Sequence, residues 1–228
     1  MAPRTSLAEP FDDVSASVAR VCGYVDDNLV SIGTGFLVHR DGYVVTAKHV
    51  IDDATRIEIV PEKWKHPIPA VWHKTNKDDM AILRVDYASL DENFLVRFVP
   101  ARILPRHKHV LAGNEVGIAG YAWGMDHKDD STLFVFKRGV ALNIMHPPIG
   151  TGLLYYLDGT AIAGMSGGPV FSLEDGCVVG VLIGTQPEDY FEFRSEAKLV
   201  RVPSPEHLTV ALQSHYIHTG LSACGVQL

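Results

Sequence analysis

Residues 164–170 read Gly-Met-Ser-Gly-Gly-Pro-Val, and Phe171 continues them as an apolar run that predicts a β-strand rather than a helix. Glycines on both sides of Ser166 let the backbone turn tightly and leave the hydroxyl unobstructed. The N–H groups beside such a serine can converge on one point, as an acyl-transfer enzyme needs for its oxyanion. A glycine-rich turn with an incidental serine would have the same sequence pattern. Whether Ser166 is a nucleophile therefore depends on which other residues the chain offers.

Outward from this stretch the chain reads as short apolar or alternating runs separated by turn residues, a pattern typical of strands. Asp41-Gly42 is a strong hairpin signal, and Ser204-Pro205-Glu206 predicts the start of a C-terminal helix that continues through Leu208 and His215. The expected strands cover 18–25, 35–38, 43–47, 56–60, 70–72 and 80–85, then 115–121, 132–144, 153–157, 169–173, 177–183 and 197–202. Two such sets predict an all-β fold of two barrels with a short C-terminal helix.

The predicted organisation has four parts: an N-terminal extension (1–14), a first barrel (15–105), a second barrel (106–203), and a C-terminal helix and tail (204–228). The 228 residues carry a net charge of −7, so no basic surface for nucleic acid is expected. No apolar run approaches the length of about 18 residues that a membrane span needs, so no membrane partner is expected.

Cysteine usage and the N-terminus bear on the compartment. Cys22, Cys177 and Cys224 lie far apart without a CxxC pattern, which is compatible either with one disulfide and one thiol or with three thiols. Residues 1–21 have no apolar core of the length of a secretory signal, which favours the cytoplasm. We expect no metal site and no cofactor.

A serine nucleophile needs a base, and the base needs an acid that orients it. His49 follows a predicted strand end, whereas most of the other ten histidines lie among charged residues. Asp78 and Asp79 both directly precede the apolar run that starts at Met80, so either could supply the acid.

Four segments, in this order, resemble the successive signatures of chymotrypsin-fold (trypsin-like) serine proteases, in versions nearest to the bacterial HtrA-like branch: Gly-Thr-Gly-Phe-Leu-Val (33–38), Thr-Ala-Lys-His-Val (46–50), Asp-Met-Ala-Ile-Leu (79–83) and Gly-Met-Ser-Gly-Gly-Pro-Val (164–170). The resemblance spans roughly residues 15–215. It implies two six-stranded antiparallel barrels, with the active site in the cleft between them. It further implies His49 as general base, Asp79 rather than Asp78 as its partner, Ser166 as nucleophile, and the N–H groups of Gly164 and Ser166 as oxyanion donors.

The sequence departs from the family pattern in three places. Met165 stands where digestive relatives place an aspartate that pairs with a newly cut N-terminus, so activation by such cleavage is not expected. Thr160 stands where an Arg/Lys-specific pocket would carry an acid, so we expect a small or apolar P1 residue and a pocket formed by Thr160, Ala161, Ile183 and Gly184. No PDZ module is expected.

The function expected from the resemblance is hydrolysis of a polypeptide substrate by a serine endopeptidase. Residues 164–168 also fit the nucleophile elbow of α/β-hydrolases, but there the acid and the histidine follow the serine in the chain. A non-catalytic binding or sensor module on the same fold remains an alternative, as does a protease that stays latent until a protein partner orders residues 164–166.

Overall fold

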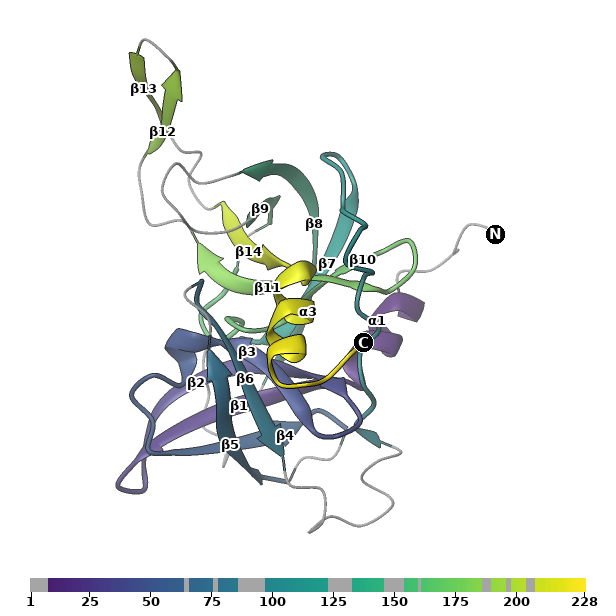
Figure 1. The fold of residues 1–228 in the computed structure, drawn as a ribbon, viewed down its shortest axis with the longest axis vertical. Coiled ribbons are helices and arrows are strands. Elements are labelled where there is room, and N and C mark those ends of the chain that lie inside the picture. The colour runs from purple at the N-terminus through teal and green to yellow at the C-terminus, as the bar shows by residue number, and fades with distance from the viewer. Residues whose placement is uncertain are drawn as a thin grey trace.

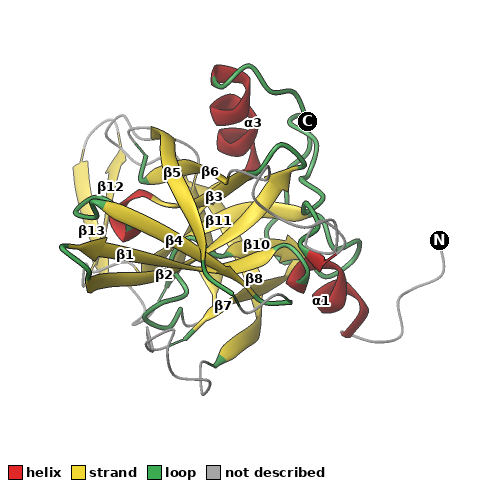
Figure 2. Cartoon of the chain, turned by 90° about the horizontal axis from the view of Figure 1, so that it is seen from below, coloured by secondary structure: helices red, strands yellow, loops and turns green. Residues whose placement is uncertain are grey.

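The described strands form two closed six-stranded antiparallel barrels, and the two barrels lie one against the other (Figure 1). The computed structural model describes residues 8–63, 66–75, 78–85, 97–122, 133–145, 154–159, 161–185, 190–195, 198–203 and 208–228. Strands dominate, with a short helix at the C-terminal end (Figure 2). The all-β double barrel predicted from the sequence is therefore confirmed.

The first barrel has the strand order β1-β2-β3-β6-β5-β4. A helix that the strand pattern did not predict, α1 (Ala8–Ser15), precedes it. Asp26 and Asp27 both have positive φ (47° and 64°) and join β1 to β2 in a two-residue turn, which is the geometry of a type I′ hairpin. The strands are β1 (Val18–Val25), β2 (Asn28–His39), β3 (Tyr43–Ala47), β4 (Arg56–Pro61), β5 (Ile68–Thr75) and β6 (Met80–Val85).

The second barrel has the strand order β10-β11-β14-β9-β8-β7. Its strands are β7 (Glu115–Tyr121), β8 (Phe134–Met145), β9 (Leu154–Asp158), β10 (Pro169–Ser172), β11 (Val178–Thr185) and β14 (Thr209–Gln213). Between β11 and β14, β12 (Tyr190–Ser195) and β13 (Lys198–Pro203) pair only with each other and project away from the barrel (Figure 1).

The C-terminal elements differ from the prediction in their boundaries. Residues 209–213, expected to be helical, form β14 between β11 and β9, and the helix α3 begins only at Ser214 and ends at Ala223. Four of the five β14 residues are buried, on both faces of the strand, so its apolar run shows no alternation that would distinguish it from a helix. The second barrel thus extends past residue 203, and the expected sixth strand, 197–202, lies in the separate hairpin instead.

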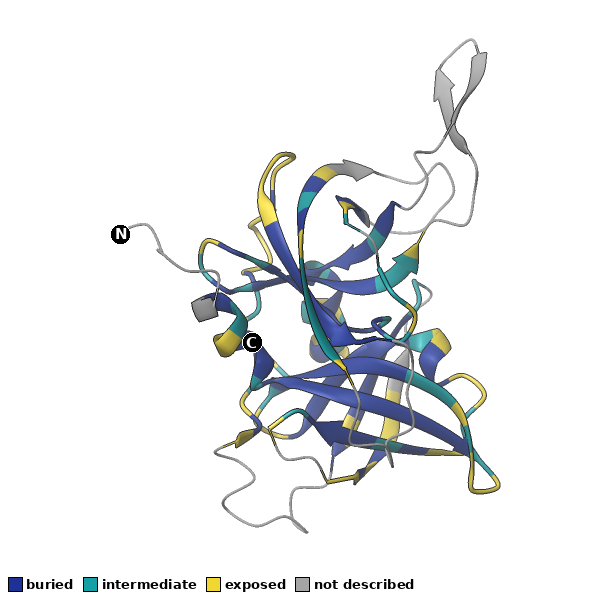
Figure 3. Ribbon diagram, turned by 180° about the vertical axis from the view of Figure 1, so that it is seen from behind, coloured by how far each residue is buried: buried dark blue, intermediate teal, exposed yellow. Residues whose placement is uncertain are grey.

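Three apolar clusters form the core, one inside each barrel and one between the barrels. Buried residues run along the strands of both barrels (Figure 3). In β3, Val44 belongs to the interior of the first barrel, whereas Tyr43 and Val45 belong to the layer between the barrels. Successive side chains point to opposite faces of a strand, and here both faces are covered. Consequently all five residues of β3 are buried, which explains the continuous apolar run.

The turn between β2 and β3 provides a test of the fold. Gly42 has φ +87°, and a Cβ there would lie 2.4 Å from the Val85 carbonyl oxygen; Gly113 has φ +88° but nothing within 4 Å of a Cβ. Gly113→Ala adds only the strain of positive φ, about 1 kcal/mol, whereas Gly42→Ala adds a backbone overlap and should cost roughly 2–4 kcal/mol in the free energy of unfolding. Urea unfolding of both variants measures the difference, and equal losses would contradict the packing of this turn against β6.

Candidate active site

His49 lies on a single 3-10 turn, Lys48–Val50, that follows the buried strand β3. The turn is closed by the Ile51 N–H donating to the Lys48 carbonyl (2.9 Å). Because the chain leaves the barrel here, the His49 side chain is half-exposed, at 48% of its free area. The end of a buried strand therefore presents an imidazole at the barrel rim.

Asp79 holds this turn through two contacts with His49 and one with Lys48. Its Oδ2 lies 2.6 Å from His49 Nδ1, its Oδ1 accepts the His49 backbone N–H (2.9 Å), and its carbonyl accepts the Lys48 N–H (2.9 Å). β3 and β6 are neighbours with Ala47 opposite Met80, so Lys48, the next residue after β3, lies opposite Asp79, the residue before β6. Asp79 has φ +63°, which costs a non-glycine residue about 1–3 kcal/mol and persists only where several contacts enforce it.

The charges around His49 favour its protonated form. The pKa of His49 is raised above its ordinary 6.5, chiefly by the hydrogen bond to Asp79, while partial burial acts in the opposite direction. The charges of Asp79 and of Asp52 raise it further, and Asp52 also forms an ion pair with Lys48. The sequence reasoning missed Asp52, whose only signal was its position three residues after His49.

Ser166 lies in two consecutive tight turns. The Met165 N–H donates to the Ile162 carbonyl (3.0 Å) and the Gly168 N–H to the Met165 carbonyl (2.9 Å). Gly164 (φ +89°) and Gly167 (φ +85°) each stand third in their turn, the position at which a type II turn requires positive φ. Along the described chain, the N–H groups of Gly164 and Ser166 have no acceptor, whereas the Gly167 N–H donates to the Leu182 carbonyl (2.7 Å).

These two turns, residues 162–168 and hereafter the serine turns, pack directly against the first barrel. The Thr34 N–H donates to the Ser166 carbonyl (2.8 Å), and Thr34 Oγ1 donates to the Gly164 carbonyl (2.8 Å). A Cβ at Gly167 would lie 2.2 Å from the Thr34 carbonyl oxygen and 2.6 Å from the backbone nitrogen of Ala47. The residue after Ser166 thus touches the strand that ends two residues before His49, which brings the three predicted catalytic residues to one junction between the barrels.

The Ser166 hydroxyl donates to the Ile183 carbonyl (3.2 Å). β11 has a register shift between Leu182, which faces Ala211, and Gly184, which faces Val210. Ile183 is therefore the extra residue of a β-bulge, a feature that redirects backbone groups out of the sheet ladder. The sequence does not reveal this bulge, because an inserted residue leaves the apolar run of β11 unbroken.

Of the four predicted pocket residues, Thr160 lies outside the described residues. Ala161 donates its N–H to Thr209 Oγ1 (2.8 Å), and Gly184 pairs with Val210, so both lie at the start of β14. Ile183 is half-buried beside them, and a Cβ at Gly184 would meet nothing within 4 Å. The structure thus brings these three residues together at one end of β11 and β14.

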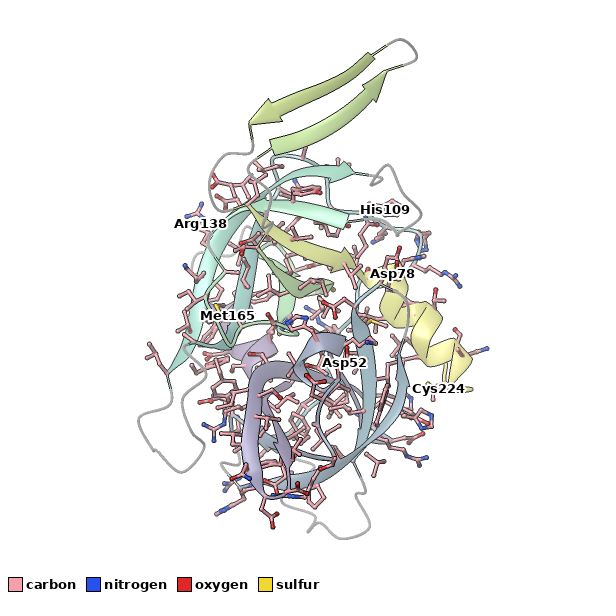
Figure 4. The ribbon with its side chains drawn as sticks, turned by 90° about the vertical axis from the view of Figure 1, so that its left-hand side faces the viewer. Asp52, Asp78, His109, Arg138, Met165 and Cys224 are labelled. Carbon is pink, nitrogen blue, oxygen red and sulfur yellow. The ribbon has the colours of Figure 1, made fainter. Side chains whose placement is uncertain are left out.

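Met165 anchors the serine turns in the interior of the second barrel. It is fully buried in the interior cluster of the second barrel, and Figure 4 shows it among the side chains of that barrel, with Asp52 at the rim of the other. A Cβ at Gly120 of β7 would lie 3.2 Å from the Met165 Cα. Apolar packing therefore occupies the position where the digestive relatives place an ion-paired aspartate.

Cys22, Cys177 and Cys224 are thiols. In the ranges that the structure describes, no three His, Cys, Asp or Glu side chains gather into a metal-binding group. No helix of the described chain is long and apolar enough to cross a membrane.

Known proteins resemble this chain in sequence and in fold. Residues 33–181 match the trypsin-like peptidase domain family. A probable periplasmic DegP-like serine endoprotease of Halomonas elongata is 29% identical over 152 residues, which cover 66% of this chain and 29% of that protein. The corresponding protein of Pseudomonas fulva is 30% identical, over 66% of this chain and 28% of its own length. The chain thus spans less than a third of these relatives.

Solved structures agree on the fold. The active form of the Rv3671c protease of M. tuberculosis superposes with a TM-score of 0.72 at 18% identity, covering 100% of this chain and 90% of that one. A serine endoprotease of Yersinia pestis superposes with a TM-score of 0.68 at 18% identity, covering 98% of this chain and 67% of that one.

The relatives also correct the expected location. Those from Halomonas and Pseudomonas are named periplasmic, which points to the periplasm, so the assignment to the cytoplasm is wrong. That assignment rested on a feature missing from residues 1–21 and on the cysteine pattern, which are weaker guides than the compartment of related proteins. With the family match covering more than half of its length, the chain belongs to the trypsin-like serine proteases and is related to the DegP-like endoproteases.

Proposed function

We propose that this chain is a serine endopeptidase that cleaves polypeptides through an acyl-enzyme on Ser166, without a metal or cofactor. The observation that carries the proposal is the meeting of the Asp79–His49 pair with the Ser166 turns, in which two N–H groups are left without an acceptor among the described residues. Nucleophile, base, orienting acid and oxyanion donors are the parts that peptide-bond hydrolysis requires.

In the proposed reaction the Ser166 hydroxyl first turns from the Ile183 carbonyl toward His49. Its oxygen bonds to the substrate carbonyl carbon while its proton passes to His49 Nε2, and the resulting oxyanion accepts from the Gly164 and Ser166 N–H groups. The imidazolium then protonates the leaving amine, the C–N bond breaks, and water releases the acyl group by the reverse proton path. Asp79 accepts the His49 Nδ1–H throughout and stabilises the imidazolium.

The proposed substrate has a small or apolar residue at P1. Ala161, Ile183 and Gly184, which adjoin one end of β14, offer only apolar or minimal side chains to that residue. Thr160 is the fourth proposed pocket residue, and it contributes no charge that would select arginine or lysine.

A partner-activated protease on the same fold is the second candidate, because the Ser166 hydroxyl bonds to Ile183 rather than to an imidazole. The N–H groups of Gly164 and Ser166, which have no acceptor among the residues that the structure describes, favour the first candidate, since a latent enzyme would need its partner to order these turns.

Covalent labelling tests the nucleophile. A fluorophosphonate probe should label the wild-type chain at Ser166 and leave Ser166→Ala unlabelled, because only an activated serine attacks the phosphorus. Ser172, whose Oγ already accepts a backbone N–H, provides a matched control, and Ser172→Ala should label like the wild type. Absence of labelling in the purified wild-type chain would favour the partner-activated or binding alternative.

The pH dependence tests the base and its acid. His49 must be neutral to accept the proton, and its folded pKa is raised, so activity should rise with pH through a midpoint above 6.5. Asp79→Asn removes the main cause of that shift: the His49 pKa measured by NMR should fall and kcat should drop by about 10⁴. Asp78→Asn is the control: it should leave the His49 pKa unchanged and change kcat by less than about threefold. The opposite ranking of the two variants would identify Asp78 as the partner.

A peptide library tests the pocket. Cleavage should be most efficient after small or medium apolar residues, by about tenfold or more over arginine and lysine, because a basic side chain would lose its hydration without gaining a counter-charge. Preferred cleavage after arginine or lysine would contradict the assignment of Thr160, Ala161, Ile183 and Gly184.

A further inference from the structure

Thr34 is a buried residue of β2 that lies between Gly33 and Gly35 and is 0% exposed. Its side-chain oxygen has two partners in the second barrel: it donates to the Gly164 carbonyl (2.8 Å) and accepts the Tyr121 N–H (2.9 Å). The Oγ1 of this single threonine therefore joins β7 to the serine turns across the junction between the barrels.

The backbone of Thr34 continues the same connection. Its N–H donates to the Ser166 carbonyl (2.8 Å), and its own carbonyl accepts Thr46 Oγ1 (2.7 Å). Two carbonyls of the serine turns, one on each side of Met165, are thus bonded to one residue of the other barrel.

These contacts fall on particular peptide planes. The plane between Gly164 and Met165 is held at its carbonyl by Thr34 Oγ1 and at its N–H by the Ile162 carbonyl. The plane between Ser166 and Gly167 is held at its carbonyl by the Thr34 N–H and at its N–H by the Leu182 carbonyl. The planes that carry the N–H groups of Gly164 and Ser166 lie on either side of the Gly164–Met165 plane.

We propose that Thr34 is a positioning residue for the oxyanion hole: its hydroxyl fixes the Gly164–Met165 peptide, and with it the relative direction of the two donors. This role of Thr34 rests on the proposed function. Donors stabilise an oxyanion only when they point at the place where charge develops, and rotation of the peptide between them would separate their directions. Without the hydroxyl, the Gly164 carbonyl and the Tyr121 N–H lose a buried partner, so the native orientation of this peptide is no longer favoured.

Thr34→Val removes the hydroxyl and keeps the shape, and Thr34→Ser keeps the hydroxyl. Ser17→Ala is the matched control, since Ser17 is also 0% exposed and donates to a backbone carbonyl (Val14, 2.7 Å), but it lies directly before β1 and its hydroxyl bonds to α1 rather than to the serine turns. We expect Thr34→Val to lower kcat by about 10–10²-fold with KM changed less than about threefold, because the lost interaction acts on the transition state.

The inhibition constant of a peptide trifluoromethyl ketone, which forms an oxyanion on the serine, should rise by the same factor as kcat falls. Thr34→Ser should retain activity within about threefold, and Ser17→Ala should lower stability without changing kcat. If Thr34→Val and Ser17→Ala have the same kcat, or if Thr34→Val raises only KM, the positioning role is refuted.

Failure of the proposed function itself gives a different result. In that case the wild-type chain is not labelled by the fluorophosphonate probe, and crystal structures of the wild type and Thr34→Val decide the role of Thr34. A Gly164–Met165 peptide that is rotated in the variant supports the inference, and an unchanged peptide refutes it.

Discussion

The apolar layer between the barrels is the constraint on which the site depends, because His49 and Asp79 belong to one barrel and Ser166 to the other. Val45 and Ile82 contribute to this layer from the first barrel, and Val181 and Leu212 from the second. Protein interiors are close-packed, so such a layer has few alternative arrangements and sets the spacing of the groups at its edge. Packing over the whole interface therefore determines a geometry that no local segment could hold by itself.

Local backbone geometry then completes what the packing begins. Asp79 and the two turn glycines at 164 and 167 all adopt positive φ, and they lie next to the groups that the proposed reaction uses. For the glycines the conformation is almost free, whereas for Asp79 it is strained and is offset by its bonds to Lys48 and His49. Conformations of this kind aim side chains and N–H groups out of regular structure, where a substrate can reach them.

The sequence predicted the double barrel because its strands are short apolar runs bounded by turn residues, and β1, β3, β6 and β7 begin and end where expected. It failed at β14, since a strand buried on both faces has no periodicity that excludes a helix. The residue types of the site could be read from local motifs. The bonds of Thr34 and the bulge at Ile183 could not, because each depends on contacts between residues distant in the chain or on backbone register. Asp52 lies only three residues after His49, but no local motif shows that the turn after β3 places its charge near the imidazole.

The Ile183 carbonyl gives the Ser166 hydroxyl an acceptor that cannot take up its proton. His49 is the other acceptor in the proposed mechanism, and it is available only when its Nε2 is unprotonated. Because Asp79 raises the His49 pKa, the imidazolium persists to a higher pH, and over that range the proposed mechanism offers the hydroxyl no imidazole acceptor. In the proposed mechanism, one deprotonation with rising pH supplies the base and also creates the acceptor toward which the hydroxyl turns, so alignment and activation of the nucleophile are parts of the same titration.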